Sequence, residues 1–400
     1  MTSYRNSDPR PPIMQGAPPQ LVPPRMDWDR PPWNRWAFQN IRQILPTAEV
    51  WRGEGPVRVL PRREQDLDGL PVTSVEGAAT TLAGLLDETY TDGFIVLKEG
   101  AVVYERYLNG MTPRTLHLSQ SVAKSVTAAA AGVLVGKGLL DVEALVTDYI
   151  PELNDTAYRG ARLQHVLDMA SGVTFDETYT NPHADIGQLD VAAGWKPVPP
   201  GSDPGFRWPR HVFEQVLGLG KLECRHGERF SYRSIETEVL GFCMERVTGK
   251  RLYDIVAEEL WQPMGAEQSA SFTVDAVGSS LADGGFNACL RDYARVGQLY
   301  LDNGGGIIPP SWVEATRNGR HDPAAPPSPS LPHGSYRNKW WIEDPQSRSL
   351  YARGVFGQMI YVSWDYRMVA AKLSSWPDFL STPFNVATQN ALHAIGRHLA

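Results

Sequence analysis

The sequence predicts an α+β fold in which both ends of the chain build one antiparallel sheet, flanked by helices, with a mostly helical region inserted between them. Three observations support this prediction. A hairpin pattern lies near residue 100, strand patterns return after residue 340, and the segments between them have helical periodicity. The chain then divides into an extended arm over 1–32, a sheet domain over 33–115 and 285–400, and a helical domain over 116–284.

The individual elements follow in chain order. Residues 1–32 are rich in proline and lack periodicity, and a helix is expected over 34–45. Two apolar runs around Glu99-Gly100 predict a hairpin over 93–107. The helices expected in the middle of the chain are 119–136, 162–170, 210–218, 235–248 and 252–260. A proline-rich loop over 321–335, strands at Trp340-Trp341, "GQMIYVS" and "MVAAKLSS", and a last helix over 383–399 complete the chain. A cleft is expected where the sheet meets the helices.

Composition excludes several classes of protein. The chain has 400 residues, 42% of them hydrophobic and 21% charged, which is typical of a globular protein. A net charge of −7 argues against a nucleic-acid surface, which would need a basic face. The longest apolar run, 126–135, is shorter than the roughly 18 residues of a membrane span. We therefore expect a protein without nucleic-acid or membrane partners that acts on a small molecule.

The cysteines and the N-terminus indicate a compartment. Cys224, Cys243 and Cys289 lie at no metal-ligand spacing, so we expect free thiols and no metal site. The first 25 residues are polar and proline-rich and lack the pattern of a secretory signal. These features predict a cytoplasmic protein that needs no cofactor.

The stretch "SQSVAKSVTAAAAGVLVGKG", residues 119–138, carries the first candidate chemistry. Ser121 and Lys124 are spaced i, i+3, so they share one helix face. A serine hydroxyl needs a base to become a nucleophile, and desolvation at an apolar helix favours the neutral lysine that could act as one. The N–H groups of the helix N-terminus suit a developing oxyanion. The alternative is an N-cap at Ser119 with a lysine that snorkels to solvent, because so short a motif also occurs by chance.

Two further segments could complete a catalytic site. Tyr232 in "SYRS" precedes a helix and could relay a proton to a leaving group, although a tyrosine there is more often a packing residue. Tyr336-Arg337-Asn338 is a competing tyrosine motif. In "ARGVFGQMIYVS", Gly357 allows close approach of the backbone, and the N–H of Gln358 could complete an oxyanion hole, unless the glycine marks a bulge.

In this order, the segments resemble the serine β-lactamase and penicillin-binding-protein family. "SQSVAKS" matches its S-x-x-K motif, "SYRS" its tyrosine motif, and "GVFGQ" stands at its third motif. The supporting stretches "QHVLDMASGVTFDE" and "LWQPMGAEQ" also match. Within the family the closest resemblance is to the 6-aminohexanoate-dimer hydrolases, over nearly the whole chain. It sets Tyr336 aside, because "GSYRNKWW" corresponds to a sheet-edge segment.

The resemblance implies a role for each site residue. Ser121 is the nucleophile, Lys124 the general base and Tyr232 a proton donor, and the N–H groups of Ser121 and Gln358, beside Gly357, form the oxyanion hole. The implied substrate-binding residues are Tyr179, which bonds the scissile nitrogen, Asp190, which favours a substrate amino group, the pocket residue Trp195, and Asp283, where relatives carry an amide or imidazole. The resemblance also implies a homodimer.

Two departures narrow the function. Val355-Phe356-Gly357 replaces Lys-Thr-Gly and so removes that motif's cation, and Tyr232 is followed by Arg233-Ser234 rather than x-Asn; both argue against an efficient β-lactamase. The expected function is hydrolysis of linear amides or carboxylic esters through an acyl-enzyme. The alternatives are a promiscuous carboxylesterase, a weak D-amino-peptidase or β-lactamase of the same fold, and a non-catalytic binding protein. An α/β-hydrolase would need a G-x-S-x-G elbow, and 278–282, GSSLA, lacks its second glycine.

Overall fold

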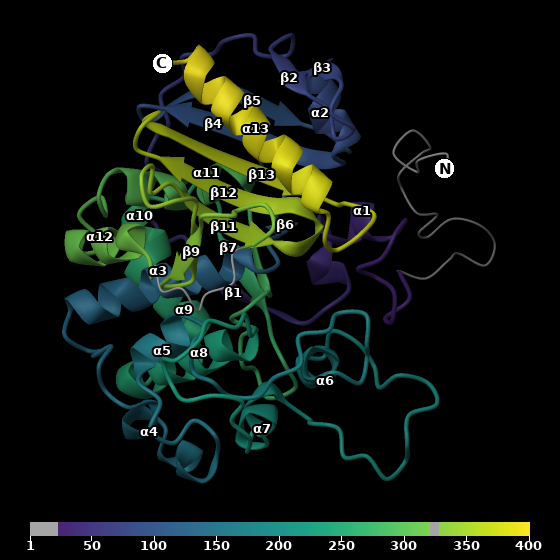
Figure 1. Ribbon diagram of the computed structural model, residues 1–400, viewed down its shortest axis with the longest axis vertical. Coiled ribbons are helices and arrows are strands. Elements are labelled where there is room, and N and C mark those ends of the chain that lie inside the picture. The colour runs from purple at the N-terminus through teal and green to yellow at the C-terminus, as the bar shows by residue number, and fades with distance from the viewer. Residues whose placement is uncertain (1–22, 321–327) are drawn as a thin grey trace.

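A seven-stranded antiparallel sheet dominates the computed structural model, which describes residues 23–320 and 328–400 (Figure 1). Its strands, in spatial order, are β5 (Ala101–Tyr107), β4 (Thr91–Lys98), β13 (Met368–Ser374), β12 (Gln358–Ser363), β11 (Leu350–Gly354), β10 (Trp340–Ile342) and β9 (Ser335–Arg337). Strand β4 pairs with β13, so the early and late parts of the chain meet inside the sheet. The predicted fold class is confirmed.

The hairpin of β4 and β5 forms where the sequence predicts it. Glu99 and Gly100 both have positive φ, 50° and 76°, as a two-residue hairpin turn requires. The run from Phe94 to Leu97 is buried on both faces because helices cover both sides of the sheet. An unbroken apolar run rather than an alternating one is the pattern of such a doubly covered strand.

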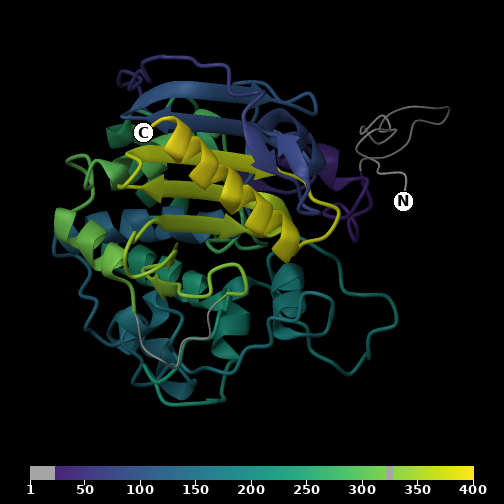
Figure 2. The same cartoon turned by 45° about the horizontal axis from the view of Figure 1, so that its top comes forward.

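Helices pack on the two faces of the sheet. Helix α13 (Thr382–His398) crosses one face, and α2 (Leu82–Glu88) lies beside it over the small hairpin of β2 (Pro71–Thr73) and β3 (Ala79–Thr81) (Figure 2). Helix α11 (Leu290–Leu301) covers the other face, against β4, β12 and β13. A Cβ at Gly297 would lie 2.6 Å from Cγ1 of Val369, so α11 approaches the sheet more closely than a side chain there would allow.

Helix α3 (Val122–Gly136) joins the sheet to the helical region. Every residue from Val122 to Leu134 is buried, and the helix contacts both strand β11 and helix α8 (Ile235–Thr248). A helix that is apolar all round belongs in an interior. The other helices of this region are α4 (Val146–Tyr149), α5 (Leu163–Leu167), α6 (Asp185–Ala192), α7 (Val212–Leu217), α9 (Leu252–Val256) with the π-helical segment Ala257–Trp261, α10 (Gln262–Met264), and the 3₁₀ turn Pro151–Asp155.

A second, four-stranded sheet lies beside the helices, in the order β1 (Thr47–Val50), β7 (Ala270–Thr273), β8 (Phe286–Ala288) and β6 (His117–Leu118). It takes strands from both of the predicted domains. Its edge strand β6 leads directly into Ser121. Helix α12 (Pro310–Asn318) and the 3₁₀ turn Val355–Gly357 are the remaining elements of this half of the chain.

The helix predicted over 34–45 is wrong in extent. The structure has a short helix α1 (Asn34–Ala37) and a separate 3₁₀ turn (Ile41–Gln43). Asn40 interrupts them: its backbone leaves the helical region (φ −136°), and its side chain donates to the carbonyl of Trp36 at 2.9 Å. Asparagine commonly breaks a helix by such a local bond. The predicted arm over 1–32 and the loop over 321–335 lie in part outside the described residues, because 1–22 and 321–327 are not described.

Candidate active site

Ser121 stands at the N-terminal end of α3, as the sequence predicts. It is the residue that precedes the helix, and its side chain makes no capping bond to the helix. Gln120, just before it, has a φ of 49°, a left-handed conformation that is uncommon for a residue with a side chain. Such strain often occurs at functional positions. The hydroxyl of Ser121 is therefore free for chemistry and held on a rigid element.

Lys124 contacts Ser121 directly. Its Nζ lies 2.8 Å from Oγ of Ser121, within hydrogen-bond distance. The same ammonium donates to the carbonyl of Asp283 at 3.0 Å and to the carboxylate Oδ2 of Asp283 at 3.2 Å. The Lys124 side chain is 1% exposed, so these contacts exclude water from it. The i, i+3 pair and the distant Asp283 are thus one cluster.

The charge state of Lys124 differs from the sequence-based expectation. Burial is the largest single influence and lowers its pKa, as expected, but Asp283, Tyr232 and Glu177 together outweigh it and leave the pKa raised above its ordinary value. Sequence reasoning considered desolvation alone, because nothing in the spacing shows that Asp283 lies beside the lysine. The raised pKa favours the ammonium form of Lys124, which must lose a proton before it can act as a base.

Glu238 holds Asp283 in place. This buried side chain on α8 accepts the backbone N–H groups of Ala282 at 3.1 Å and Asp283 at 2.8 Å. Burial and the neighbouring Asp283 carboxylate together raise the pKa of Glu238 well above its usual value. Glu238 on α8, the helix that follows the tyrosine motif, therefore fixes the loop that carries Asp283.

Tyr232 reaches the same cluster from the turn before α8. The Nζ of Lys124 lies 5.2 Å from the centre of its ring. Burial raises the pKa of Tyr232, and interactions with Lys124 and Ser121 partly offset that rise. The ring stacks on Trp341, with centroids 5.8 Å apart and planes at 16°. Tyr336, the competing tyrosine, packs edge-on against Tyr232 at 6.2 Å and is a supporting residue.

A half-buried carboxylate that sequence reasoning missed, Glu177, orders the wall beside Tyr232. It accepts the hydroxyl of Ser234 at 2.5 Å, the N–H of Ser234 at 2.9 Å and the hydroxyl of Tyr179 at 2.7 Å. Burial raises the pKa of Glu177, whereas the charge of Lys124 lowers it. Ser234 is thereby anchored in the motif that lacks its usual asparagine. A carboxylate in an aperiodic loop gives no sequence signal of burial.

Gly357 and Gln358, the predicted oxyanion residues, do not line the cavity around Ser121 among the described residues. Gln358 is 1% exposed, and its amide exchanges hydrogen bonds with the backbone of Ser374 at 2.7 and 3.0 Å. A Cβ at Gly357 would lie 2.2 Å from the ring of Trp376. The close approach that the glycine permits is therefore to a tryptophan behind the site, and the backbone N–H of Gln358 stays a prediction.

Gly354 and Val355, three residues earlier, come to the nucleophile instead. A Cβ at Gly354 would lie 2.5 Å from the carbonyl oxygen of Ser119, and Val355 lines the cavity with Ser121. Phe356 has a φ of 61°, which turns the chain away from the cavity and into strand β12. The sequence motif was matched through a glycine, and the segment contains two, Gly354 and Gly357. The sequence could not show which of them lies close to the nucleophile.

The cavity at Ser121 has two arms. We name the first the charged arm; it contains Asp29, Arg30, Asp190, Trp195, Lys196 and Asp283 among its lining residues. The second, which we name the aromatic arm, is lined among others by Tyr232, Trp341, Arg353, Trp376 and Phe379. Ser121, Tyr179, Val355 and Phe379 line both arms, so the nucleophile stands where the arms join. Their volumes are about 60 and 350 Å³.

Asp190 and Trp195 lie in the charged arm, as the resemblance implied. Asp190 faces Lys196 at 3.8 Å, and Lys196 in turn pairs with Asp29 at 2.8 Å. Burial raises the pKa of Asp190 to about 7, although Lys196 opposes the rise. The indole of Trp195 donates to the hydroxyl of Thr273 at 2.9 Å. Lys196, the direct neighbour of Trp195 in sequence, supplies an internal cation where a substrate amine was expected.

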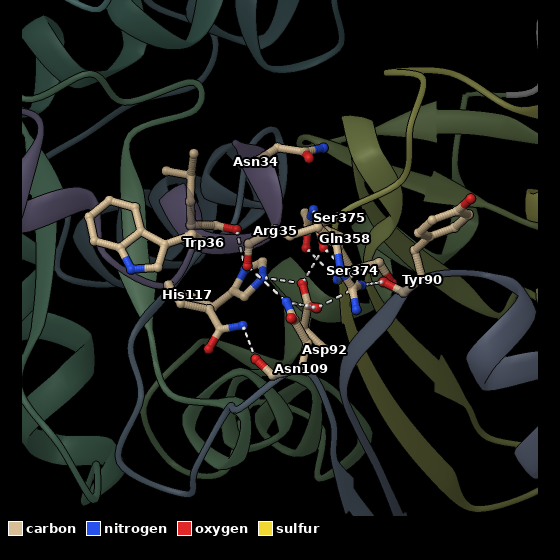
Figure 3. A network of polar contacts seen from close by, with 12 residues as sticks. Asn34, Arg35, Trp36, Tyr90, Asp92, Asn109, His117, Gln358, Ser374 and Ser375 are labelled. Carbon is tan, nitrogen blue, oxygen red and sulfur yellow. Dashed lines mark hydrogen bonds and ion pairs between the residues drawn. The ribbon is translucent and has the colours of Figure 1, made fainter. Parts of the chain in front are cut away.

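A network of buried polar groups supports the segment that leads into Ser121 (Figure 3). Asp92 on β4 is fully buried and bonds Arg35 at 3.2 Å, Asn109 at 2.8 Å and Ser375 at 2.7 Å. It also bonds Nε2 of His117 at 3.0 Å. His117 is on β6, four residues before the nucleophile, so α1, β4, β6 and the segment that follows β13 are tied together behind the site. Removing one partner of such a buried pair typically costs about 3–5 kcal/mol.

Membrane-spanning helices and clusters of metal ligands are both absent from residues 23–320 and 328–400. No helix among them is long and apolar enough to cross a membrane. Likewise, this part of the chain contains no group of three or more His, Cys, Asp or Glu residues placed to hold a metal ion.

Comparison with known proteins agrees with this geometry. The β-lactamase family pattern matches residues 79–394. The chain is 34% identical over 366 residues to a 6-aminohexanoate-dimer hydrolase of Paenarthrobacter ureafaciens, covering 89% of each chain. A Bacillus anthracis structure assigned as a 6-aminohexanoate-dimer hydrolase superposes with a TM-score of 0.84 at 30% identity, covering 94% of this chain and 96% of the other.

A more distant structure shares the fold alone. A penicillin-binding protein homologue from Pyrococcus abyssi matches with a TM-score of 0.59 at 17% identity, over 78% of this chain and 75% of the other. The family pattern covers well over half of the chain, and the identities to the first two proteins extend over nearly all of it. The chain therefore belongs to the β-lactamase family and is a serine hydrolase of amides or esters.

Proposed function

We propose that the protein cleaves linear amides of the 6-aminohexanoate-dimer type, and carboxylic esters, through an acyl-enzyme on Ser121. The observation that carries this proposal is the 2.8 Å contact between Nζ of Lys124 and Oγ of Ser121 at the junction of the two arms. A positioned base next to a serine hydroxyl is the requirement for covalent acyl transfer.

The first step would transfer the Ser121 proton to neutral Lys124 while Oγ attacks the substrate carbonyl. The oxyanion would be bound by the N–H groups of Ser121, at the start of α3, and of Val355. We assign Val355 rather than Gln358 because Val355 lines the cavity. Because the Asp283 carboxylate favours the ammonium form of Lys124, we expect the rate to rise with pH.

The second step would break the bond to the leaving group. An amide nitrogen needs a proton as the C–N bond breaks, and Tyr232, in contact with Lys124, is placed to pass that proton on. Tyr179, which lines both arms, would hold the nitrogen in position. Water would then attack the acyl-enzyme, with Lys124 acting again as base, and release the acid.

The competing function is a promiscuous carboxylesterase that does not cleave amides. Ester leaving groups depart without a delivered proton, so an esterase would need Ser121 and Lys124 but not Tyr179. The bond between Tyr179 and Glu177 favours the amide hydrolase, because it fixes a hydroxyl at the point where the two arms meet.

The test is hydrolysis by the purified protein of the linear 6-aminohexanoate dimer, p-nitrophenyl acetate and nitrocefin. We expect turnover of the dimer and the ester, with nitrocefin the slowest substrate. Ser121→Ala should lower turnover by about 10⁴-fold or more without changing the circular dichroism spectrum. Ester cleavage without dimer cleavage would select the carboxylesterase. Labelling by a fluorophosphonate at a serine other than Ser121 would contradict the assignment of the nucleophile.

We further propose a homodimer that acts in the cytoplasm. The resemblance to dimeric relatives supports the dimer, and the free cysteines Cys224, Cys243 and Cys289 support a reducing compartment. Light scattering coupled to size-exclusion chromatography measures the mass directly. A single species of about 44 kDa, the mass of one chain, would rule the dimer out.

A further inference from the structure

Arg353, at the end of β11, has no assigned role in the catalytic steps above, yet it lines the aromatic arm together with Ser121. Its guanidinium lies over the ring of Tyr351, 4.7 Å from the centre. Nη1 donates to the hydroxyl of Ser330 at 2.8 Å. Nε and Nη2 are buried and have no hydrogen-bond partner among the described residues.

Arg353 is half-buried as a whole, whereas three fully buried arginines of the chain are paired with carboxylates. Arg35 bonds Asp92, Arg233 bonds Glu236, and Arg295 bonds Asp292. Arg353 has no carboxylate within 4.0 Å in the described part of the chain. A cation without a paired carboxylate in a partly desolvated place is costly, so an anionic ligand that pairs with it there is favoured.

The groups around Arg353 leave the position of its counter-ion open to a ligand. Glu343 is the carboxylate that acts on Arg353 electrostatically, but its oxygen already accepts bonds from His393 at 2.7 Å and Tyr351 at 3.2 Å. Burial lowers the pKa of Arg353 to about 10, so the group is still a cation at neutral pH. Its one acceptor, the hydroxyl of Ser330, is neutral, and a carboxylate is a stronger partner for a guanidinium.

Arg353 is also the one side chain with a formal charge at neutral pH that lines the aromatic arm, as far as the described residues show. Asp29, Asp190 and Asp283 all line the other arm. A substrate carboxylate in the aromatic arm would therefore meet a cation and no lining anion, whereas in the charged arm it would meet three acidic side chains beside two basic ones, Arg30 and Lys196, of which Lys196 already pairs with Asp29 and Asp190.

The position of Tyr232 decides which part of the substrate the aromatic arm takes. Tyr232, the proton donor to the leaving group in the proposed function, lines the aromatic arm and not the charged arm. The leaving group must lie on the side of its proton donor. The acyl portion then extends into the charged arm, toward Asp190.

We propose that Arg353 binds a carboxylate on the leaving-group portion of the substrate and so selects amides whose amine half is an amino acid. The inference rests on the proposed function, because it takes Ser121 and Tyr232 as the reacting groups. The motif at 355–357 lacks the lysine of Lys-Thr-Gly, and in this proposal Arg353 supplies a cation to the aromatic arm. Arg353 is a specificity residue and takes no part in bond breaking.

The experiment uses two series of amides with one acyl group, 6-aminohexanoyl. In the first series the leaving amine is glycine, 4-aminobutyrate or 6-aminohexanoate; in the second it is the uncharged alkylamine of matching length. The measured quantity is the ratio of kcat/KM between the two members of each pair. In the wild type we expect the carboxylate to be preferred by about ten- to a hundredfold at one chain length, the value of one charge-assisted bond.

Variants place the preference on Arg353. Arg353→Gln should bring the ratio close to one, and Arg353→Lys should keep part of the preference because it keeps the charge. Arg225→Gln, at a side chain that is 91% exposed and lies outside both arms, is the matched loss of one positive charge and should leave the ratio as in the wild type. Hydrolysis of p-nitrophenyl acetate by each variant reports whether it is folded and acylated.

The outcomes separate this inference from the proposed function. A wild-type ratio near one, or a ratio unchanged in Arg353→Gln, overturns the role of Arg353 while amide cleavage itself still stands. If amides are not cleaved, the same comparison is made with 4-acetoxybenzoate and its methyl ester. Calorimetric binding of 4-hydroxybenzoate, weakened in Arg353→Gln and unaffected in Arg225→Gln, supports the carboxylate site even without turnover; equal binding to all three proteins rejects it.

Discussion

The charged and aromatic arms meet at the same serine but differ in how their charges are satisfied. In the charged arm, Asp190 and Asp29 share Lys196, and Asp283 pairs with Lys124. In the aromatic arm, Arg353 has only a neutral serine hydroxyl as acceptor among the described residues. A ligand cation entering the first arm must compete with a lysine that is already there, whereas a ligand anion entering the second replaces a weaker neutral partner.

This difference bears on how the two halves of a substrate are selected. A substrate amine at Asp190 must replace the existing Lys196 contact, so binding gains only the difference in free energy between the two contacts. Selectivity for the amine should therefore be modest. In the proposed binding mode, the carboxylate half meets Arg353, which pairs with no carboxylate of the described residues, in a wider cavity, so the preference for it should be stronger. The catalytic groups shared by both arms should affect every substrate, while residues of one arm should affect only one half.

The largest effect is expected at the shared base. Lys124→Arg should lower kcat/KM by about 10²–10⁴-fold for amides and esters alike, because a guanidinium cannot give up its proton to act as base. Lys124→Ala should be equally damaging, and steady-state assays of both substrate classes measure the comparison. An arginine variant that keeps more than about a tenth of the wild-type rate would exclude proton transfer by Lys124.

The next effect concerns Tyr179, which lines both arms and donates to Glu177. Tyr179→Phe should lower amide cleavage by about a hundredfold and leave ester cleavage within about fivefold, because esters need no positioned proton at nitrogen. The ratio of kcat/KM for matched amide and ester substrates measures it. Equal losses for both substrates would mean that Tyr179 shapes the cavity rather than positioning nitrogen.

A smaller effect is expected at Asp190 in the charged arm. The wild type should prefer an amino-amide dimer to its N-acetylated form by about tenfold, and Asp190→Asn should remove that preference. Burial raises the pKa of Asp190 to about 7, and the carboxylate attracts an amine only when ionised. The preference should therefore be larger at pH 8 than at pH 6. A preference that is independent of pH, or that survives in Asp190→Asn, would place the amine elsewhere.

The smallest effect concerns Asp283, which bonds Lys124 from the charged arm. Its carboxylate raises the pKa of Lys124 and so favours the protonated, inactive form. Asp283→Asn should shift the rising limb of the pH–rate profile to lower pH by about half a unit, equivalent to about a threefold higher rate below that limb. The profile of p-nitrophenyl acetate hydrolysis measures the shift. A limb that moves to higher pH would contradict this coupling.

Local pattern was sufficient for much of the fold. The turn at Glu99-Gly100, the continuous apolar runs of β4 and β13, and the apolar helix after Ser121 were each predicted because hydrophobic periodicity and turn residues act over short stretches. The helix expected over 34–45 failed because one asparagine side chain, at Asn40, bonds the backbone and ends it. Ordinary periodicity does not register such a bond.

The sequence by itself determined the fold class, the family and the Ser121–Lys124 pair, because spacing along one helix fixes which side chains share a face. Only the tertiary structure decided which distant groups meet that pair: Asp283 beside Lys124, Val355 rather than Gln358 at the nucleophile, and Arg353 in the aromatic arm. The physical reason is that burial and charge pairing depend on contacts between segments far apart in the chain. The raised pKa of Lys124, and the lack of a paired carboxylate at Arg353 among the described residues, depend on those contacts and on no local pattern.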